Sequence, residues 1–462
     1  MVEAFLLEIL LIITFFAALI LSVRQLLKSY YKSLLAWYTF VYSFVMNIAT
    51  MLLPYTGLPD FYIIEYDQLI VNRIYYGLIL INSIAFGFLL FIDQIFSKKK
   101  SPAYFTHTAS LTIPAMFKTR FKILYFIILL ALIYLSTSPE IMETIEDLKG
   151  IVQSRDYAYY YGIRSIATHK YIDPLSLSIP IKLIIFDITV PLMCLYSLYG
   201  WLLTKKYIWL QRWFFSLFIW LMISIITIQK GPILELVLSN FILLIFMQYE
   251  KGKIRNFKSL LKKIVAYSLP LFIPIFGLYA ILGFEGNLLF EVLKRVIFEP
   301  IYTTYTHFAT FPDAYPHLSL SSSKLLSALS SDGQPVINEE PYQLVAMTAT
   351  GAFFNANTSM LGTGWAKAGY WGIAQNAVLL FGVLLCWDIY LRKSKRQLLL
   401  VPLVSLYLGR ANSVLNVGTN NMLISFGFLI IPLIYIIIFH KQSRRLTVLQ
   451  KRISIIDSGT CI

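Results

Sequence analysis

The sequence predicts an all-α, polytopic membrane protein with about eleven membrane-spanning helices. Hydrophobic residues make up 58% of the 462 residues and charged residues only 14%, whereas a soluble domain is about 25% charged. The mean hydropathy is +0.69, and apolar runs recur along the whole chain. These observations exclude a water-soluble globule. We expect residues 1–462 to form a single integral membrane domain.

The predicted spans are apolar runs bounded by charged residues or by Pro, Gly and Asn, because roughly twenty apolar residues cross a bilayer. The first run has neither a basic leader nor a small-residue cleavage site, so we expect a retained span. The tenth is too short to cross alone, which predicts that the chain after Leu408 is packed inside the protein or lines a cavity. The runs lie at residues 4–23, 34–54, 69–96, 122–138, 177–203, 208–228, 231–249, 264–283, 369–391, 398–409 and 420–440.

The distribution of basic residues predicts the orientation. Loops after odd-numbered spans, together with the C-terminal tail, hold 27 of the 39 Lys and Arg residues, and the opposite side holds 12. Basic loops remain cytoplasmic. We therefore expect the N-terminus outside and the C-terminus inside, with the basic tail at 441–462 lying on the anionic cytoplasmic leaflet.

Two predicted external loops are long, at residues 138–177 and 284–368, whereas the cytoplasmic loops are short and basic. Long loops in compact proteins usually carry function, so we expect the work of the protein on its outer face. The three cysteines show no CxxC spacing, and neither a disulfide framework nor a zinc site is predicted. The positive charge is confined mainly to membrane-flanking loops, so nucleic acid is not an expected partner.

The first external loop combines arginines with tyrosines. Arg155 and Arg164 lie within a stretch that also contains five tyrosines. Aromatic rings can cover the apolar face of a sugar, and a guanidinium binds phosphate oxygens bidentately. The alternative is an interfacial aromatic belt with arginines that reach toward water.

Lys230 ends the sixth predicted span, where Gly231 and Pro232 break the helix before Glu235. A cation at a helix break within the membrane can bind an anion together with exposed backbone N–H groups. The alternative is a structural Lys230–Glu235 pair across the hairpin.

The second external loop opens with Arg295 and Glu299, which are i,i+4 neighbours on a short predicted helix that Pro300 interrupts. His307 follows in an aromatic stretch. Such a trio could bind a diphosphate and supply a general base. The alternative is a surface Arg–Glu pair beside a solvated histidine.

The break between the last two spans is rich in polar residues. Arg410 follows Gly409, and four asparagines lie between residues 412 and 421. Polar groups at membrane depth must face a cavity, a partner or a ligand. Arg410 is therefore the strongest candidate functional residue. The glycines and aromatics of residues 361–382 instead indicate close helix packing at the membrane interface.

These features together resemble the bacterial O-antigen polymerases, the Wzy-type oligosaccharide repeat-unit polymerases. The resemblance covers nearly the whole chain and depends on five places: the Arg155 loop, Lys230 before its helix-breaking pair, Arg295 in KRVIFEP, the segment LGTGWAKAGYWGIAQNAVLLFG, and Arg410 in YLGRAN. At the sixth span, Lys230 stands where many members have Arg, which keeps a cation but removes bidentate geometry.

The resemblance implies a GT-C-like, metal-independent glycosyltransferase of the bacterial inner membrane that uses no cofactor. It would polymerise undecaprenyl-diphosphate-linked repeat units into O-antigen or capsule-type polysaccharide on the outer face, with a chain-length regulator protein and membrane lipids as candidate partners. The catalytic candidates are His307, then Glu299. The substrate- and diphosphate-binding candidates are Arg155, Arg164, Lys230, Arg295 and Arg410.

Two rival functions remain open at the level of sequence. A flippase or transporter of lipid-linked oligosaccharide would also place cations at membrane depth, although transporters usually contain internal repeats and none is visible here. An O-antigen ligase cannot be separated from a polymerase by these motifs. A membrane O-acyltransferase is disfavoured, because no early span carries a His-rich motif.

Overall fold

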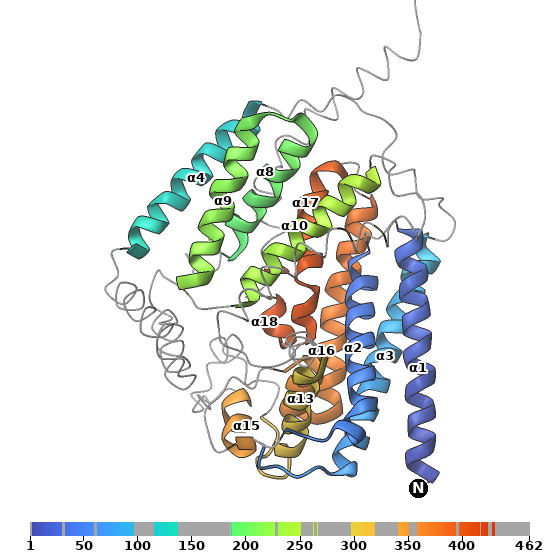
Figure 1. Ribbon diagram of the computed structural model, residues 1–462. Helices are drawn as coiled ribbons and strands as arrows, with labels where there is room; N and C mark the ends of the chain where they lie inside the picture. Colours follow the sequence, from blue (N-terminus) through green and yellow to red (C-terminus); the bar gives the residue numbers. More distant parts are fainter. Residues whose placement is uncertain are drawn as a thin grey trace, which may run out of the picture.

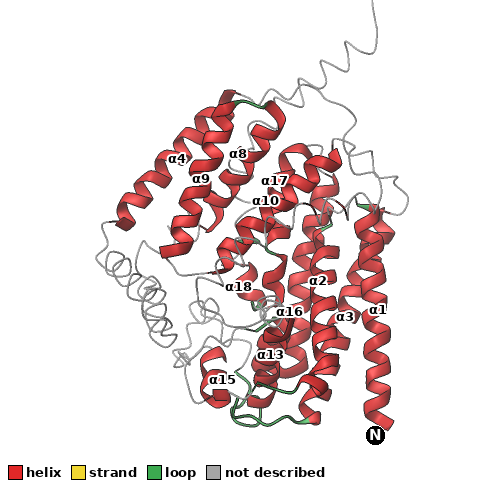
Figure 2. Cartoon of the chain, viewed as in Figure 1, coloured by secondary structure: helices red, strands yellow, loops and turns green. Residues whose placement is uncertain are grey.

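In the computed structural model the regular elements among the described residues are all helices, and loops and turns join some of them (Figures 1 and 2). Its helices reach 29 residues in length, in the segment Gln68–Phe96. The described residues are 2–29, 33–59, 62–96, 115–136, 185, 187–226, 230–250, 262, 266, 297–318, 341–350, 358–393, 397–415, 417–423 and 427–429.

Three long apolar helices form the N-terminal part, namely α1 (Val2–Lys28), α2 (Leu34–Thr56) and α3 (Gln68–Phe96). They pack against one another, and α3 and α2 also contact α16 (Met360–Lys393). Asn47 and Asn82 face each other across α2 and α3, with Asn82 donating to Asn47 at 3.0 Å. Such side-chain hydrogen bonds join helices where apolar contact alone gives no advantage over lipid.

The predicted close packing at residues 361–382 is confirmed, and it takes the form of a hairpin. Ala368 and Gly369 have non-helical backbone angles inside α16, and Gly369 has φ +58°, which favours glycine. The first arm folds back on the second, so that a Cβ on Gly364 would lie 2.7 Å from backbone atoms of Ile373. Asn376 ties the arms together by donating to the Met360 carbonyl at 3.2 Å.

A second group of helices lies beside this bundle. It contains α4 (Ala115–Ser136), α8 (Val190–Thr204), α9 (Tyr207–Ile226), α10 (Lys230–Glu250) and α17 (Gln397–Gly409). The Tyr125 hydroxyl joins α4 to α9 by donating to the Arg212 carbonyl at 3.1 Å. Helices α8, α10 and α17 contact one another, and α17 also contacts α2. The two groups therefore meet at α17.

Short helices fill the remaining described positions. They are α13 (Glu299–Thr310), α15 (Pro341–Thr350), η4 (Ala411–Leu415) and α18 (Thr419–Leu423). Pro300 lies in the first turn of α13, where its missing N–H costs no helical hydrogen bond. The helix continues to Thr310, so Pro300 begins this helix and does not interrupt it.

Four described helices are long and apolar enough to cross a membrane: Phe5–Lys28, Leu34–Thr56, Gln68–Phe96 and Met360–Leu391. A membrane protein is thus supported, while the count of eleven spans stays a prediction. The loop at 138–177 and the tail at 441–462 lie outside the described residues, as do most of the predicted span at 264–283, about half of the loop at 284–368 and most of the span at 420–440.

The prediction for the chain after Leu408 is confirmed. The helix α17 has 13 residues, which corresponds to about 20 Å of helix and falls short of the hydrocarbon thickness. The following residues are packed inside the protein, since Arg410, Val414 and Leu415 are all buried. The chain therefore breaks its helix in the interior of the bundle.

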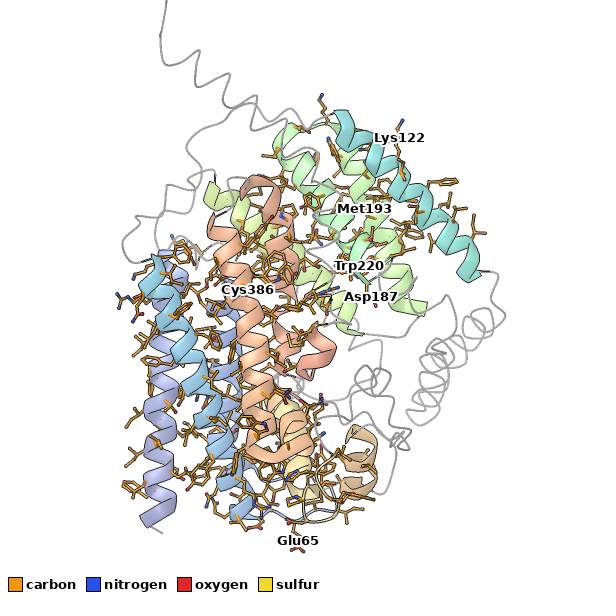
Figure 3. The ribbon with its side chains drawn as sticks, turned by 180° about the vertical axis from the view of Figure 1, so that it is seen from behind. Glu65, Lys122, Asp187, Met193, Trp220 and Cys386 are labelled. Atoms are coloured by element: carbon orange, nitrogen blue, oxygen red, sulfur yellow. The ribbon has the colours of Figure 1, made fainter. Side chains whose placement is uncertain are left out.

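Charged side chains mark both ends of the described part of the molecule. Figure 3 shows Glu65 at the end where the N-terminus lies and Lys122 at the other, with Asp187 and Cys386 between them. At the end opposite the N-terminus, Asp93 binds Lys28 at 2.5 Å and Arg24 at 3.5 Å. We call the end with Glu65 the N-terminal end of the bundle.

Candidate functional site

Arg410 lies at the point where α17 ends, and its side chain is almost completely buried at 3% exposure. Its Nε donates to Oε2 of Glu235 on α10 at 3.0 Å. Its Nη2 donates to the main-chain carbonyl of Asp187, just before α8. The guanidinium therefore joins three segments that are far apart in the sequence. Figure 3 places Asp187 about midway between the two ends of the molecule.

Local geometry explains why the chain can hold a cation there. The Arg410 amide still completes helical hydrogen bonds to the carbonyls of Leu406 and Tyr407, both at 3.1 Å. The Tyr38 hydroxyl on α2 donates to the same Tyr407 carbonyl at 2.6 Å. A helix end needs partners for its last carbonyls, and the tyrosine from the neighbouring bundle supplies one.

Gly409 allows the close approach of α17 and α10 that forms the ion pair. A Cβ at this position would overlap the Ser239 hydroxyl and lie 2.9 Å from the Ser239 backbone nitrogen. Ser239 lies one helical turn after Glu235, so the contact between Gly409 and Ser239 sets the distance between the charged partners. The small residues therefore position the ion pair.

The partner of Glu235 differs from the one that the sequence suggests. The described ion pair of Glu235 is with Arg410, which is 175 positions away. Lys230 begins α10, but its side chain lies outside the described residues. Arg155, Arg164 and Arg295 also lie outside them. Among the predicted phosphate-binding cations, only the placement of the Arg410 side chain is therefore described.

His307 lies in the interior of the bundle, on α13, and is 1% exposed. Its Nδ1 is 2.7 Å from the Thr303 carbonyl, so this nitrogen carries the hydrogen in the neutral ring. Burial lowers the pKa of the imidazole to about 4, from an ordinary value of 6.5. The ring is therefore neutral at pH 7, and a sugar hydroxyl can reach it only if α13 moves.

Glu299 has a different environment from His307. It is exposed in the first turn of α13, eight residues before the histidine, which corresponds to about 12 Å along a helix. The structure does not bring these two candidates for the catalytic base to one point. A role as general base stays a separate prediction for each residue, with Glu299 exposed and His307 buried.

The helix that carries His307 also carries four buried threonines, which the sequence analysis did not single out. Thr303, Thr304, Thr306 and Thr310 are buried, and each donates to a main-chain carbonyl three or four residues earlier. The Thr304 hydroxyl also lies 2.9 Å from that of Thr358, at the start of α16. The sequence feature that could have indicated this helix is the run TTYTHFAT, in which Thr303, Thr306 and Thr310 recur at a spacing of three or four residues.

Two buried or half-buried acids inside predicted spans were also missed. Asp187 supplies the carbonyl that binds Arg410. Asp388 on α16 is 1% exposed and accepts hydrogen bonds from the Ser33 hydroxyl and, at 2.7 Å, from the Leu34 amide. Asp388 therefore caps α2 from another helix. A carboxylate within an apolar run was the available signal for both residues.

Comparison with known proteins gives no relative for this chain: no family model matches it, and neither a curated protein nor a solved structure is detectably similar. Within the described residues, no three His, Cys, Asp or Glu side chains gather as metal ligands would. Any functional assignment therefore depends on the residues and their geometry.

Proposed function

We propose that the protein is a glycosyltransferase of the bacterial inner membrane that polymerises undecaprenyl-diphosphate-linked oligosaccharide repeat units. It has about eleven spans in a GT-C-like arrangement, and its N-terminal end faces outward. The observation that carries the proposal is the buried guanidinium of Arg410 at a helix break inside the bundle. Non-helical backbone and an ionisable side chain at this depth mark sites of function in membrane proteins.

The charge distribution supports an outward-facing N-terminal end. Lys122 and the Arg24–Lys28–Asp93 group lie at the opposite end, where predicted cytoplasmic loops carry most of the basic residues. The described carboxylate Glu65 lies at the N-terminal end, and Asp313, which accepts from Arg73 on α3, follows α13 within the predicted second external loop. This is the side on which lipid-linked repeat units would be polymerised.

The proposed reaction transfers the growing glycan from its carrier to the incoming repeat unit. A hydroxyl at the non-reducing end of the repeat unit attacks the anomeric carbon of the glycan, the bond to the diphosphate oxygen breaks, and the hydroxyl proton is released. The leaving undecaprenyl diphosphate gains negative charge, so nearby cations are the main expected source of rate enhancement. The proposed cations are Arg410, Arg155, Lys230 and Arg295, with Arg164 binding substrate.

Deletion of the gene in its host, with surface glycan separated on a gel, tests the proposal. Loss of the long ladder, with single capped repeat units retained and the ladder restored by a plasmid copy, is the expected result. A normal ladder in the deletion strain would refute a polymerase. Loss of all capped glycan would instead indicate a ligase or a flippase.

A flippase of lipid-linked oligosaccharide is the second candidate, and the Arg410–Glu235 pair is the observation that favours it. Paired charges inside a membrane bundle also mark transport pathways. The two functions differ in where the uncapped repeat unit accumulates. A polymerase mutant leaves it on the outer leaflet, accessible to added glycosidases, whereas a flippase mutant retains it on the inner leaflet.

A further inference from the structure

Four chain segments converge on one surface near the N-terminal end, and neither Arg410 nor His307 is among the residues that form it. Arg73 on α3 donates to Asp313 after α13 at 3.2 Å. The Tyr370 hydroxyl, from the second arm of the α16 hairpin, donates to the Arg73 carbonyl at 3.3 Å. The Trp365 ring on the first arm lies 5.1 Å from the Tyr370 ring and 5.4 Å from the His317 ring.

This surface combines exposed aromatic rings with a charged pair of zero net charge. Tyr370 is 38% exposed, Tyr76 beside it is 44% exposed, and the Asp313 side chain is 61% exposed. Aromatic rings match the apolar C–H faces of a pyranose. Sugar hydroxyls both donate and accept hydrogen bonds, so they can use a carboxylate and a guanidinium at the same time.

An interfacial aromatic belt accounts for only part of the arrangement. An aromatic belt consists of rings at the boundary of the hydrocarbon, and this role does not require a carboxylate or a histidine beside the rings. The Nδ1 atom of His317 is buried and has no hydrogen-bond partner among the described residues. A buried polar atom without a partner is costly, and a belt gives no account of it. The balanced charge of Arg73 and Asp313 also disfavours a phospholipid headgroup of net negative charge.

The backbone holds these side chains in a fixed arrangement. The Leu318 amide donates to the Ala366 carbonyl at 3.0 Å, and the Trp365 indole donates to the Phe311 carbonyl at 2.6 Å. Gly369 forms the tip of the hairpin, and a Cβ added to it would come 3.5 Å from His317 Nε2. A surface ordered before binding loses little conformational entropy when a ligand arrives.

We propose that this surface, the Arg73–Tyr370 cluster, binds a sugar ring of the lipid-linked glycan on the outer face of the membrane. The choice of glycan rests on the proposed function, whereas the geometry of the cluster does not. The cluster consists of Arg73, Tyr76, Asp313, His317 and Tyr370, all at least partly exposed, together with the buried Trp365 ring that packs against Tyr370 and His317.

The test uses the full-length protein in lipid nanodiscs, with the repeat-unit oligosaccharide released by mild acid from the surface polysaccharide of the host. Calorimetry should give saturable binding to the wild type. Tyr370→Leu and Asp313→Ala should each weaken it at least tenfold. Trp371→Leu is the matched control, because Trp371 is the next residue in the same hairpin and is 70% exposed, as a membrane-belt residue would be, so its binding should be unchanged.

Equal losses for Tyr370→Leu and Trp371→Leu, or wild-type binding by both cluster variants, would overturn the inference. Size-exclusion profiles and thermal melting confirm that each variant is folded. The same proteins are then screened on a glycan array. A normal ladder in the deletion strain with array binding that depends on Tyr370 would refute the polymerase and retain the sugar site. A lost ladder, together with cluster variants that bind sugar as the wild type does, would refute the sugar site and retain the polymerase.

Discussion

Substitutions that remove one partner of the Arg410–Glu235 ion pair should reveal how much this pair contributes to the free energy of unfolding. The side chains are 3% and 17% exposed and lie 3.0 Å apart. Arg410→Met leaves the Glu235 carboxylate enclosed without its cation, and removal of one partner of a buried pair typically costs about 3–5 kcal/mol. The partial exposure of Glu235 places the expected loss near the lower limit, at about 3 kcal/mol.

Glu235→Leu should cause a loss of the same order, because it removes the carboxylate to which the buried guanidinium donates. The double variant, with two apolar side chains in contact, should lose far less than the sum, since replacing a buried pair by apolar residues is often close to neutral. The free energy of unfolding, measured by denaturant titration in micelles with tryptophan fluorescence, gives the coupling between the two positions.

The surface pair at the opposite end supplies the control. Arg24 is 57% exposed and lies 3.5 Å from Asp93, so Arg24→Met should cost less than about 1 kcal/mol. Losses for Arg410→Met and Glu235→Leu that add in the double variant to within about 0.5 kcal/mol would refute the coupling. A double variant that is stable and still makes a normal glycan ladder would show that the charge of Arg410 is not needed for polymerisation.

Three further predictions concern other parts of the bundle. Gly372→Ala should disrupt the α16 hairpin, because a Cβ would overlap the Gly364 carbonyl, whereas Gly382→Ala, with nothing within 4 Å, should leave thermal melting unchanged; equal melting temperatures would contradict this. His307→Gln should remove a pH dependence of the free energy of unfolding. In the unfolded chain the histidine binds a proton below about pH 6.5, whereas in the folded protein it does so only near pH 4. The wild type should therefore be fully stable above pH 6.5 and lose about 3 kcal/mol as the pH falls to 4. Parallel curves for wild type and variant between those values would refute it. Asp388→Ala should cost about 1–3 kcal/mol in denaturant titrations, since the amide and hydroxyl that it accepts from at the start of α2 lose their acceptor, and an unchanged midpoint would contradict this role.

The sequence predicted the long helices well. The run at 34–54 became α2 at Leu34–Thr56, and the run at 69–96 became α3 at Gln68–Phe96. Both are apolar for twenty residues and end at charged or turn-forming residues, so local composition alone sets their limits. The same reasoning predicted the short apolar segment at 398–409, which forms the helix α17 at Gln397–Gly409, because the polar residues after it cannot face lipid.

Long-range partners could not be predicted in this way. The spacing in the sequence offered Lys230 as a possible ion-pair partner for Glu235. The described partner, Arg410, follows α17 and lies 175 positions farther along the chain. His307 posed a different difficulty. The segment that forms α13 lies in the predicted external loop after Pro300, and its threonines donate to main-chain carbonyls of the same helix, which allows their hydroxyls to be buried. Hydrophobic periodicity does not reveal such a helix.

The ion pair with Glu235 limits how Arg410 could bind a diphosphate. A guanidinium that already binds Glu235 and a carbonyl can hold a diphosphate only if the phosphate displaces or joins the carboxylate. Glu235→Gln keeps an oxygen acceptor for the guanidinium but removes the competing negative charge. It should therefore tighten binding of undecaprenyl diphosphate, by about tenfold if the competition is worth ~1.4 kcal/mol, as measured by native mass spectrometry of nanodisc-released protein. An unchanged affinity would mean that Arg410 serves the helix break alone, and the phosphate would then have to be held by the cations of the outer loops.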